Sequence, residues 1–244
     1  MSPTTGALYL IPTSLGEQSW DTTVPPAVRE KMCELDYFVV ENAKTARAQL
    51  KRVAYPHPLQ SVEMHELPKH GSGHDLHPLL APLLAGKSAG LMSEAGCPAV
   101  ADPGALLVRA AHEKGIRVVP LVGPSSLLLA LMASGLNGQR FAFQGYLPVP
   151  EAEREKSISR LEAESLRLDQ TELVIETPYR NDALFVSLRR TCKPTTLLCV
   201  ASDLLLPTQE ISTQSIAVWR TIPQPKLAKR PTVFLFLAQA AKAR

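Results

Sequence analysis

The sequence predicts an α/β protein with a parallel sheet in its N-terminal part and a mixed sheet in its C-terminal part. In the first half, short apolar runs rich in β-forming residues alternate with helix-like stretches, as expected of parallel strands joined by crossover helices. In the second half, two β-like runs follow each other with no helix between them, which requires antiparallel or mixed pairing. The 244 residues, 45% hydrophobic and 20% charged, have the composition of an ordinary globular protein with one large or two small domains.

The N-terminal part alternates regularly from its first apolar run. Strands are expected at residues 7–11, 37–40, 88–92 and 116–122, and helices at residues 25–35, 43–53, 77–85 and 104–114. Continuous apolar strands are typical of a sheet that helices cover on both faces. In such sheets ligands bind beyond the carboxyl ends of the strands, so the loops that follow the strands are the first candidates for a site.

The C-terminal part starts as a similar alternation and then departs from it. Strands are expected at residues 141–143, 173–176 and 197–201, helices at 151–168 and 182–192, and two further strand-like runs at 216–222 and 232–238. The change of pattern predicts two domains, residues 1–122 and 123–244.

Charge, cysteine content and hydropathy exclude several classes of protein. The net charge of +3 is too small to indicate a nucleic-acid-binding protein, although residues 140–244 hold 15 Lys and Arg against 11 Asp and Glu. The four cysteines form no CxxC pair and are typical of reduced thiols in the cytosol, so we expect a cytoplasmic protein. The first residues lack a signal-peptide pattern. Pro120 and the run 123–126 divide the uncharged stretch 118–139 into strand, turn and helix, so we expect no membrane span.

The most informative stretch is residues 93–104, Ser-Glu-Ala-Gly-Cys-Pro-Ala-Val-Ala-Asp-Pro-Gly. It follows a predicted strand and precedes a predicted helix, and its glycine and proline suit a tight, exposed turn. Asp102 before Pro103 predicts a helix N-cap. Glu94 lies where a ligand is expected to approach, and spacing alone leaves open whether it contacts a ligand or is a solvated loop carboxylate.

A second loop of this kind is Gly123-Pro124-Ser125-Ser126. Glycine allows a close approach of the backbone to a ligand, and serine hydroxyls with free amides at a helix N-terminus attract carboxylates and phosphates. The alternative is that one of the serines only caps the helix. Neither loop is a nucleotide fingerprint, because no GxGxxG or GxxxxGK[ST] pattern occurs in the chain.

Five of the six histidines lie in one stretch, at His57, His65, His70, His74 and His77. The His65-Glu66 pair and His70 depart from HExxH by one residue, and Pro68 breaks the helix that this motif needs. We therefore expect a mobile polar loop here and no metal site.

Charged residues follow two other predicted strands. Glu41, Lys44 and Arg47 place a carboxylate and two cations after strand 37–40, where the alternative is a helix start capped by Asn42 with the cations on a wet face. Residues 176–181, Glu-Thr-Pro-Tyr-Arg-Asn, follow a strand of the second half, with Asn181 expected as a cap. In this stretch Arg180 could bind a phosphate through two N–H groups or simply lie on the surface.

Together these stretches resemble the tetrapyrrole methylase family of S-adenosylmethionine-dependent methyltransferases. The nearest branch contains the bacterial small-subunit ribosomal RNA cytidine 2′-O-methyltransferases. The family motif SDAGTPxxSDPG resembles residues 93–104, PGPSA resembles 122–126, FxFxGFLP resembles 141–148 and YESPHR resembles 175–180. Four matches in order, in a resemblance that runs from Leu8 to Phe236, are highly specific for the family.

The resemblance implies a two-domain α/β homodimer with S-adenosylmethionine in the cleft between the domains. It implies cofactor contacts, many of them through the backbone, at Leu10, Pro12, Glu94, Cys97, Ser125, Ser126, Thr177, Leu204 and Thr232. If the acceptor is a ribose hydroxyl, Glu41 is the candidate base. Lys44, Arg47 and Arg180 are then candidates for contacts to phosphate or to the developing alkoxide.

The chain departs from the branch at several motif positions. The branch's ATPIGNLxD becomes residues 11–17 without the asparagine, its EDTR becomes residues 41–44, and its SPHR becomes Thr177-Pro178-Tyr179-Arg180. The acidic loop has Glu94 in place of aspartate, and the chain ends soon after Phe236. Three functions therefore remain: a ribose methyltransferase of ribosomal RNA or the small ribosomal subunit, a methyltransferase of a small molecule or another macromolecule, and a non-catalytic S-adenosylmethionine-binding protein.

Overall fold

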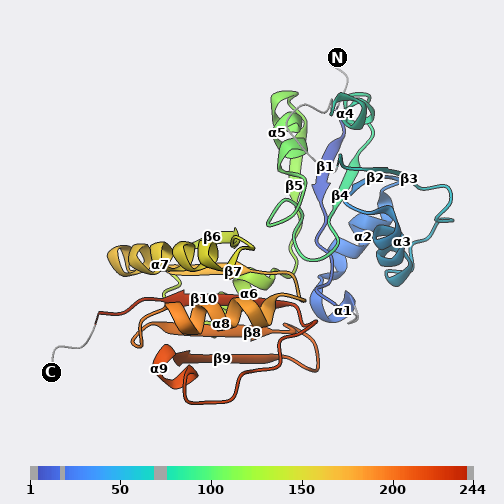
Figure 1. The fold of residues 1–244 in the computed structure, drawn as a ribbon. Helices are drawn as coiled ribbons and strands as arrows, with labels where there is room; N and C mark the ends of the chain where they lie inside the picture. The colour runs from blue at the N-terminus through green and yellow to red at the C-terminus, as the bar shows by residue number, and fades with distance from the viewer. Residues whose placement is uncertain (1–4, 17–19, 69–75, 241–244) are drawn as a thin grey trace. The chain divides into compact units, whose positions relative to one another are not determined.

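The computed structural model describes residues 5–16, 20–68 and 76–240. The chain divides into two compact units, Met1–Ser125 and Ser126–Arg244, and each unit contains one five-stranded sheet (Figure 1). The division falls close to the boundary expected after residue 122, which remains a prediction.

The sheet of the N-terminal unit is entirely parallel. Its strands are β1 (Ala7–Leu10), β2 (Tyr37–Val40), β3 (Glu63–Glu66), β4 (Ala89–Met92) and β5 (Arg117–Pro120), and they lie in the order β3-β2-β4-β1-β5. The predicted parallel sheet is confirmed. All five strands end at the same edge, so the loops that follow them are brought close together.

Helices cover both faces of this sheet. They are α1 (Trp20–Thr23), α2 (Pro26–Glu34), α3 (Ala43–Arg52), α4 (His77–Leu84) and α5 (Ala105–Glu113). Successive side chains of β2 point to opposite faces. Phe38 packs in a core with residues of α2 and α3, and Tyr37 packs in a second core with residues of α4 and α5. The two cores explain why the strands read as continuous apolar runs.

Strand β3 corrects the expectation of a mobile polar loop between His57 and His77. Residues 63–66, Glu-Met-His-Glu, pair in parallel with all of β2. The strand lies at the edge of the sheet with mostly exposed side chains, so its backbone hydrogen bonds hold it rather than an apolar pattern. His70 and His74 lie outside the described residues.

The C-terminal unit has a mixed sheet, as predicted. Its strands are β6 (Phe141–Tyr146), β7 (Thr171–Ile175), β8 (Leu197–Ser202), β9 (Glu210–Ser215) and β10 (Thr232–Leu237), in the order β6-β7-β10-β8-β9. Strands β6 and β7 are parallel, and the other neighbours are antiparallel. Strand β10 lies at the centre of the sheet and all six of its residues are buried.

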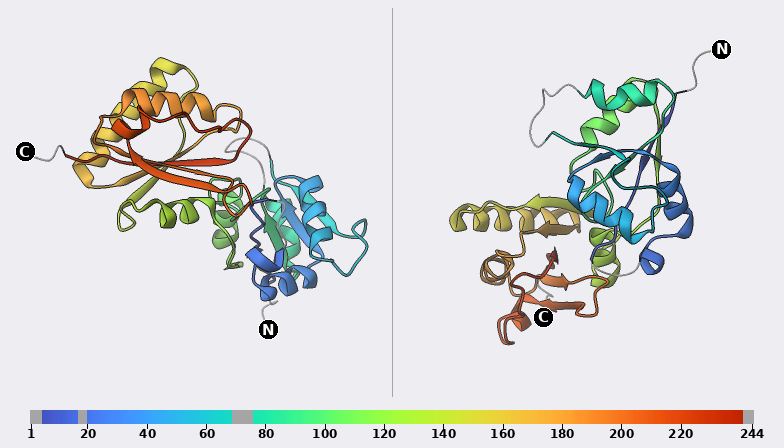
Figure 2. Two further views of the ribbon diagram at one scale, coloured as in Figure 1. Left: turned by 90° about the horizontal axis from the view of Figure 1, so that it is seen from below. Right: turned by 90° about the vertical axis from the view of Figure 1, so that its right-hand side faces the viewer.

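Four helices accompany this sheet: α6 (Ser126–Ser134), α7 (Glu151–Leu168), α8 (Asn181–Thr191) and α9 (Ile216–Trp219). Side chains of α7 and α8, among them Leu161 and Phe185, form one core with Phe234 of β10. Helix α6 contacts β8, β9 and β10 from the opposite face of the sheet (Figure 2). The unit is therefore a sheet between two layers of helix.

The strand predicted at residues 216–222 is wrong. Strand β9 ends at Ser215, and residues 216–219 form the short helix α9. The Ser215 hydroxyl accepts a hydrogen bond from the amide of Val218 at 3.3 Å and caps this helix. Ile216 and Trp219, three residues apart, both turn into the core, and Trp219 Nε1 donates to the Leu198 carbonyl at 2.8 Å. The helical spacing of these two buried residues explains why an apolar run is not a strand here.

The uncharged stretch 118–139 contains the end of β5 and all of α6. Within the described ranges of the chain, the structure holds no helix with the length and apolar character needed to cross a membrane.

Candidate functional site

The loops that follow β1, β4 and β5 are joined at one edge of the N-terminal sheet. The Thr13 amide donates to the Gly96 carbonyl at 2.8 Å, and the Gly96 amide donates to the Thr13 carbonyl at 3.2 Å. The Cys97 thiol donates to the Pro124 carbonyl, with Sγ 3.4 Å from the oxygen. These contacts bring together the segments that carry the predicted cofactor residues of this unit, Leu10, Pro12, Glu94, Cys97 and Ser125. Ser126, also predicted, is the first residue of α6.

Three carboxylates gather beyond the ends of β2 and β4. Glu41 Oε2 accepts a hydrogen bond from the Glu94 amide at 3.1 Å, and the Thr45 hydroxyl donates to Glu94 Oε1 at 3.3 Å. Burial, and then the nearby charge of Glu41, raise the pKa of Asp102 to about 6. A carboxyl with this pKa can exchange a proton close to neutral pH. The negative charge of this edge suits a cationic ligand group.

Asp102 is not the helix cap that the sequence predicted. Helix α5 begins at Ala105, and its N-cap is Gly104 with a φ of 128°, a backbone conformation that only glycine adopts easily. The chain turns in the left-handed region already at Ala99 and Ala101. The carboxyl of Asp102 therefore does not bond the first turn of α5, and it lies close enough to Glu41 for the charge of Glu41 to raise its pKa.

Side-chain oxygens of Asn42 and Glu66 cap the N-terminus of α3. Asn42 is the cap that one of the two sequence interpretations predicted. Asn42 Oδ1 accepts from the amides of Lys44 at 2.9 Å and Thr45 at 3.1 Å, and Glu66 Oε1 accepts from the Ala43 amide at 2.9 Å. These oxygens occupy the amides that would otherwise bind an anion. The exposed side chains of Lys44 and Arg47 make no ion pair or hydrogen bond with another described residue, so they are available for a polyanion.

Three strands of the C-terminal sheet bring the predicted cofactor residues of this unit to one edge. Thr177 follows β7, Leu204 follows β8, and Thr232 begins β10. Because β10 is antiparallel to both β7 and β8, its start lies beside their ends. Thr232 pairs with Ser202 across the sheet, and their hydroxyl oxygens lie 2.9 Å apart.

The loops at this edge are also linked to one another through their backbones. The Lys229 amide donates to the Pro178 carbonyl at 3.0 Å, and the Asp203 amide donates to the Pro231 carbonyl at 2.9 Å. Among the described residues, the N–H and C=O of buried Leu204 make no hydrogen bond. A backbone donor and acceptor without a described partner fit a ligand that presents a complementary polar edge.

Arg180 is held by a buried carboxylate at the end of β7. Its Nη2 donates to Glu176 Oε1 at 2.7 Å, and the Thr177 amide donates to the same oxygen at 2.6 Å. Burial acts to raise the pKa of Glu176, but the hydrogen bonds from Arg180 and Thr177 outweigh it and hold the pKa below its usual value. Arg180 is therefore not a free surface cation, because Glu176 binds it. Only part of its guanidinium is used in this contact.

Asn181 does not cap α8, contrary to the sequence prediction. It is the first residue of the helix and fully buried, and its Nδ2 donates to the Arg230 carbonyl at 2.7 Å. The N-cap position of α8 is taken by Arg180, and the Oδ1 of Asn181, which would have to accept from the first-turn amides, has no hydrogen-bond partner among the described residues. Its sequence position beside a helix start was therefore misleading.

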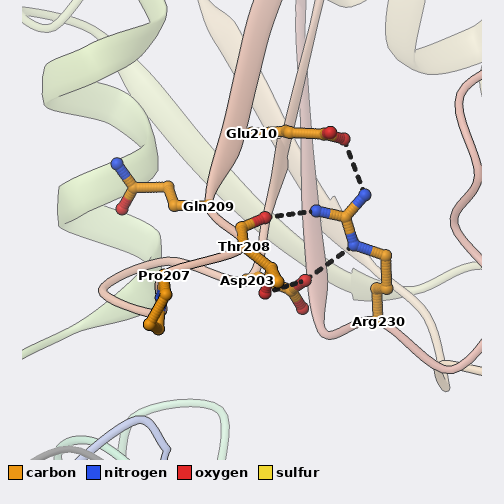
Figure 3. A pocket seen from close by; sticks show the side chains of 6 residues that line it. All are labelled: Asp203, Pro207, Thr208, Gln209, Glu210 and Arg230. Carbon is orange, nitrogen blue, oxygen red and sulfur yellow. Dashed lines mark hydrogen bonds and ion pairs between the residues drawn. The ribbon is translucent and has the colours of Figure 1, made fainter.

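A group of residues that sequence reasoning missed lies beside Leu204. Figure 3 shows a hollow that is lined by Asp203, Pro207, Thr208, Gln209, Glu210 and Arg230. The only sequence signal is a pair of opposite charges, Asp203 directly after the apolar run of β8 and Arg230 shortly before that of β10. Nothing local in the sequence shows that these two charges meet.

Groups of three or more His, Cys, Asp or Glu residues arranged to hold a metal ion are not found among the described residues. The described histidines, His57, His65, His77 and His112, therefore add no ligand cluster to the two strand edges.

The two units together have a fold that known methyltransferase structures share. The structure of the methyltransferase CobJ matches 98% of this chain and 97% of its own, with a TM-score of 0.62 and 20% identity. The structure of diphthine synthase matches 96% and 90%, with a TM-score of 0.68 and 13% identity. At these identities the likeness establishes the fold, a parallel N-terminal and a mixed C-terminal sheet.

Relatives found by sequence similarity point to one group of proteins within this class of fold. Ribosomal RNA small subunit methyltransferase I of Mesorhizobium japonicum is 40% identical over 161 residues, 66% of this chain and 51% of the relative. The protein of the same name from Synechocystis sp. is 32% identical over 199 residues, 82% of this chain and 67% of the relative. The chain belongs to the tetrapyrrole methylase family, which includes these proteins. It spans about half the length of several of these relatives, and no family model matches it.

Proposed function

We propose that the protein is an S-adenosylmethionine-dependent methyltransferase that methylates a ribose 2′-oxygen of ribosomal RNA in the small subunit. The observation that carries this proposal is the similarity to Ribosomal RNA small subunit methyltransferase I over 82% of the chain. The excess of Lys and Arg over Asp and Glu in residues 140–244 is consistent with a polyanionic substrate.

The two strand edges suit S-adenosylmethionine by their chemistry. The carboxylates of Glu41, Glu94 and Asp102 fit a cationic group, and Leu204 offers a backbone N–H and C=O that no described residue uses. The cofactor, when bound, supplies a methyl group already activated by its sulfonium. The proposed contact residues are those implied by the family resemblance: Leu10, Pro12, Glu94, Cys97, Ser125, Ser126, Thr177, Leu204 and Thr232.

Residues of the chain itself then position the acceptor hydroxyl and accept its proton. Correct placement alone contributes roughly 7–11 kcal/mol in favourable cases. The Glu94 amide holds Glu41 Oε2, which leaves Oε1 to accept the proton of the hydroxyl. Lys44 and Arg47 bind flanking phosphates. Arg180, held by Glu176, directs the remaining N–H groups of its two Nη atoms at a phosphate or at the developing alkoxide.

We also propose a cytoplasmic homodimer. Phe141 and Phe143 lie on the same face of edge strand β6 and are 44% and 36% exposed, and Met132 of α6 is 80% exposed. Exposed apolar side chains of this kind mark association surfaces. Cys192 and Cys199 are buried and free, as expected in a reducing compartment.

Calorimetric titration with S-adenosylhomocysteine tests the cofactor part of this proposal. Wild-type protein is expected to bind with micromolar affinity, and a Ser125→Arg, Ser126→Arg double variant is expected to lose binding because two large cations fill the loop before α6. Ser159→Arg, on the exposed side of α7, is the matched control and should bind normally. No heat of binding from folded wild-type protein would refute the assignment.

Transfer of labelled methyl groups to purified small ribosomal subunits tests the acceptor. Label is expected in a ribose of the ribosomal RNA, with binding that weakens as salt rises. Label that appears only in small molecules or proteins would instead establish a methyltransferase of another acceptor class. Cofactor binding with no transfer to any acceptor would point to a non-catalytic binding protein.

A further inference from the structure

The guanidinium of Arg230 binds three residues of the segment that connects β8 to β9. Its Nε donates to Asp203 Oδ2 at 2.7 Å, its Nη1 donates to Glu210 Oε2 at 2.6 Å, and its Nη2 donates to the Thr208 carbonyl at 2.6 Å (Figure 3). These three acceptors belong to the first residue of the segment 203–210, to the last residue, and to Thr208, two residues before the end. A planar guanidinium with N–H groups on several sides is the side chain that can hold three such points at once.

The backbone of this segment is strained and needs such a fastening. Asp203 and Leu205 have φ values of 52° and 66°, left-handed conformations that are unfavourable for residues with a Cβ. Strained conformations of this kind persist only where surrounding contacts impose them. Leu204 lies between these two residues, so the direction of its N–H and C=O depends directly on them.

The ion pair between Asp203 and Arg230 is largely shielded from solvent. The side chain of Asp203 is 7% exposed and that of Arg230 is 19% exposed, and charge-assisted hydrogen bonds between such groups are strong and directional. The Thr208 hydroxyl donates to the same Asp203 Oδ2 at 2.9 Å. Glu210, by contrast, is 69% exposed, so its contact is the weaker of the two carboxylate contacts.

The backbone of Arg230 fixes the other loops of the same edge. Its carbonyl accepts from Asn181 Nδ2 at 2.7 Å and from the Thr232 hydroxyl at 3.0 Å. One residue therefore connects the starts of α8 and β10 with the 203–210 segment. Arg230 thus contacts Thr232 directly and Asp203, the residue before Leu204, so it supports two of the proposed cofactor residues of the C-terminal unit.

We infer that Arg230 is a positioning residue that sets the shape of residues 203–210 and thereby the affinity for the cofactor. The inference rests on the proposed function, in which Leu204 contacts S-adenosylmethionine. The contacts of Arg230 lie within the C-terminal unit and do not involve the acceptor residues Glu41, Lys44 and Arg47. Loss of Arg230 therefore raises the KM for S-adenosylmethionine and leaves kcat at saturating cofactor nearly unchanged.

Three variants and one control test the inference. Arg230→Met removes all the side-chain donors and is expected to raise the Kd for S-adenosylhomocysteine and the KM for S-adenosylmethionine about tenfold. Arg230→Lys keeps the charge but not the fork, and should recover only part of the affinity. Glu210→Gln keeps the buried pair and should raise Kd two- to threefold, which preserves the test if Arg230→Met does not fold. Arg190→Met is the control, because Arg190 also pairs with two carboxylates, Glu151 and Glu155, far from this edge in the sequence.

Hydrogen exchange at the amides of Leu205, Leu206, Thr208 and Gln209 gives a readout that does not depend on activity. Faster exchange in Arg230→Met and Glu210→Gln, together with weaker cofactor binding and near-normal kcat, supports the inference. Folded Arg230 and Glu210 variants with wild-type Kd, KM and exchange would overturn it while leaving the proposed function intact. Wild-type protein that binds no S-adenosylhomocysteine would refute the proposed function, and the inference with it.

Discussion

Pro12 and Gly123 pack closely against each other beyond the ends of the neighbouring strands β1 and β5. A Cβ added to Gly123 would lie 2.2 Å from the Cβ and 2.3 Å from the Cγ of Pro12, far inside van der Waals contact. The two residues are brought together because β1 and β5 are neighbours in the sheet. The glycine of the 123–126 loop therefore serves the packing of one loop against another, which sequence reasoning had attributed to the approach of a ligand.

Gly123→Ala is expected to destabilise the protein by about 1–3 kcal/mol, the usual cost of overpacking a tight site. The loop must move away from Pro12 to accommodate the methyl group, so cofactor affinity should also fall. Urea unfolding measures the first effect and calorimetry the second. Gly138→Ala is the control, because nothing lies within 4 Å of a Cβ at that exposed position. Equal stability of both variants would contradict the steric argument.

Asp102→Asn is expected to stabilise the protein at neutral pH. The folded state raises the pKa of Asp102 from 3.8 to about 6, so ionisation costs stability as pH rises through this interval and costs it fully above pH 6. Because the carboxyl is partly exposed, we expect a gain of about 1–2 kcal/mol at pH 7 rather than the full value of the shift. Below pH 3.8 the gain should vanish.

Urea unfolding of wild-type and Asp102→Asn protein between pH 4 and pH 8 measures this effect. Glu113→Gln, an exposed change at the end of α5, controls for the loss of one carboxylate. A difference between wild type and Asp102→Asn that does not change with pH would show that Asp102 does not titrate in this interval.

Glu176→Gln should change the pH dependence of stability in the opposite sense to Asp102→Asn. Since the folded state lowers the pKa of Glu176 below 4.5, its ionised form contributes stability above pH 4.5, and this contribution is lost as the pH falls through the lowered value. The variant is therefore less stable than wild type at pH 7, and the two converge in acid. Thermal unfolding at a series of pH values distinguishes this from Asp102→Asn, for which the sign is reversed.

Lys44→Ala and Arg47→Ala are expected to weaken RNA binding without affecting the Kd for S-adenosylhomocysteine. Each lost phosphate contact should reduce the slope of log K against log salt by about 0.7–0.9. Filter binding to small-subunit ribosomal RNA at several salt concentrations gives the slope. Lys156→Ala on the exposed face of α7 is the matched control, and an equal loss of slope in this variant would argue against a specific role for the two α3 cations.

Local patterns in the sequence predicted most of the fold and part of the candidate site. Buried strands such as β2 and β10 are continuous apolar runs, and Asn42 caps α3 as its position before a polar helix indicates. Strand β3 and the position of β9 were missed because both strands are polar and lie at sheet edges. Such strands are held by hydrogen bonds to a neighbour that is distant in sequence, so their own residues carry little signal.

The sequence by itself determined the alternation of strands and helices, the switch to a mixed sheet and the order of the loops that the family resemblance marks. These depend on apolar spacing and on turn residues, which act over a few positions. Only the tertiary structure decided that Glu41 meets Glu94, that Asp102 titrates near pH 6 instead of capping α5, and that Arg230 binds Asp203. These relationships depend on which strands become neighbours and on how far the chain buries each charge, and neither is a property of any short stretch of sequence.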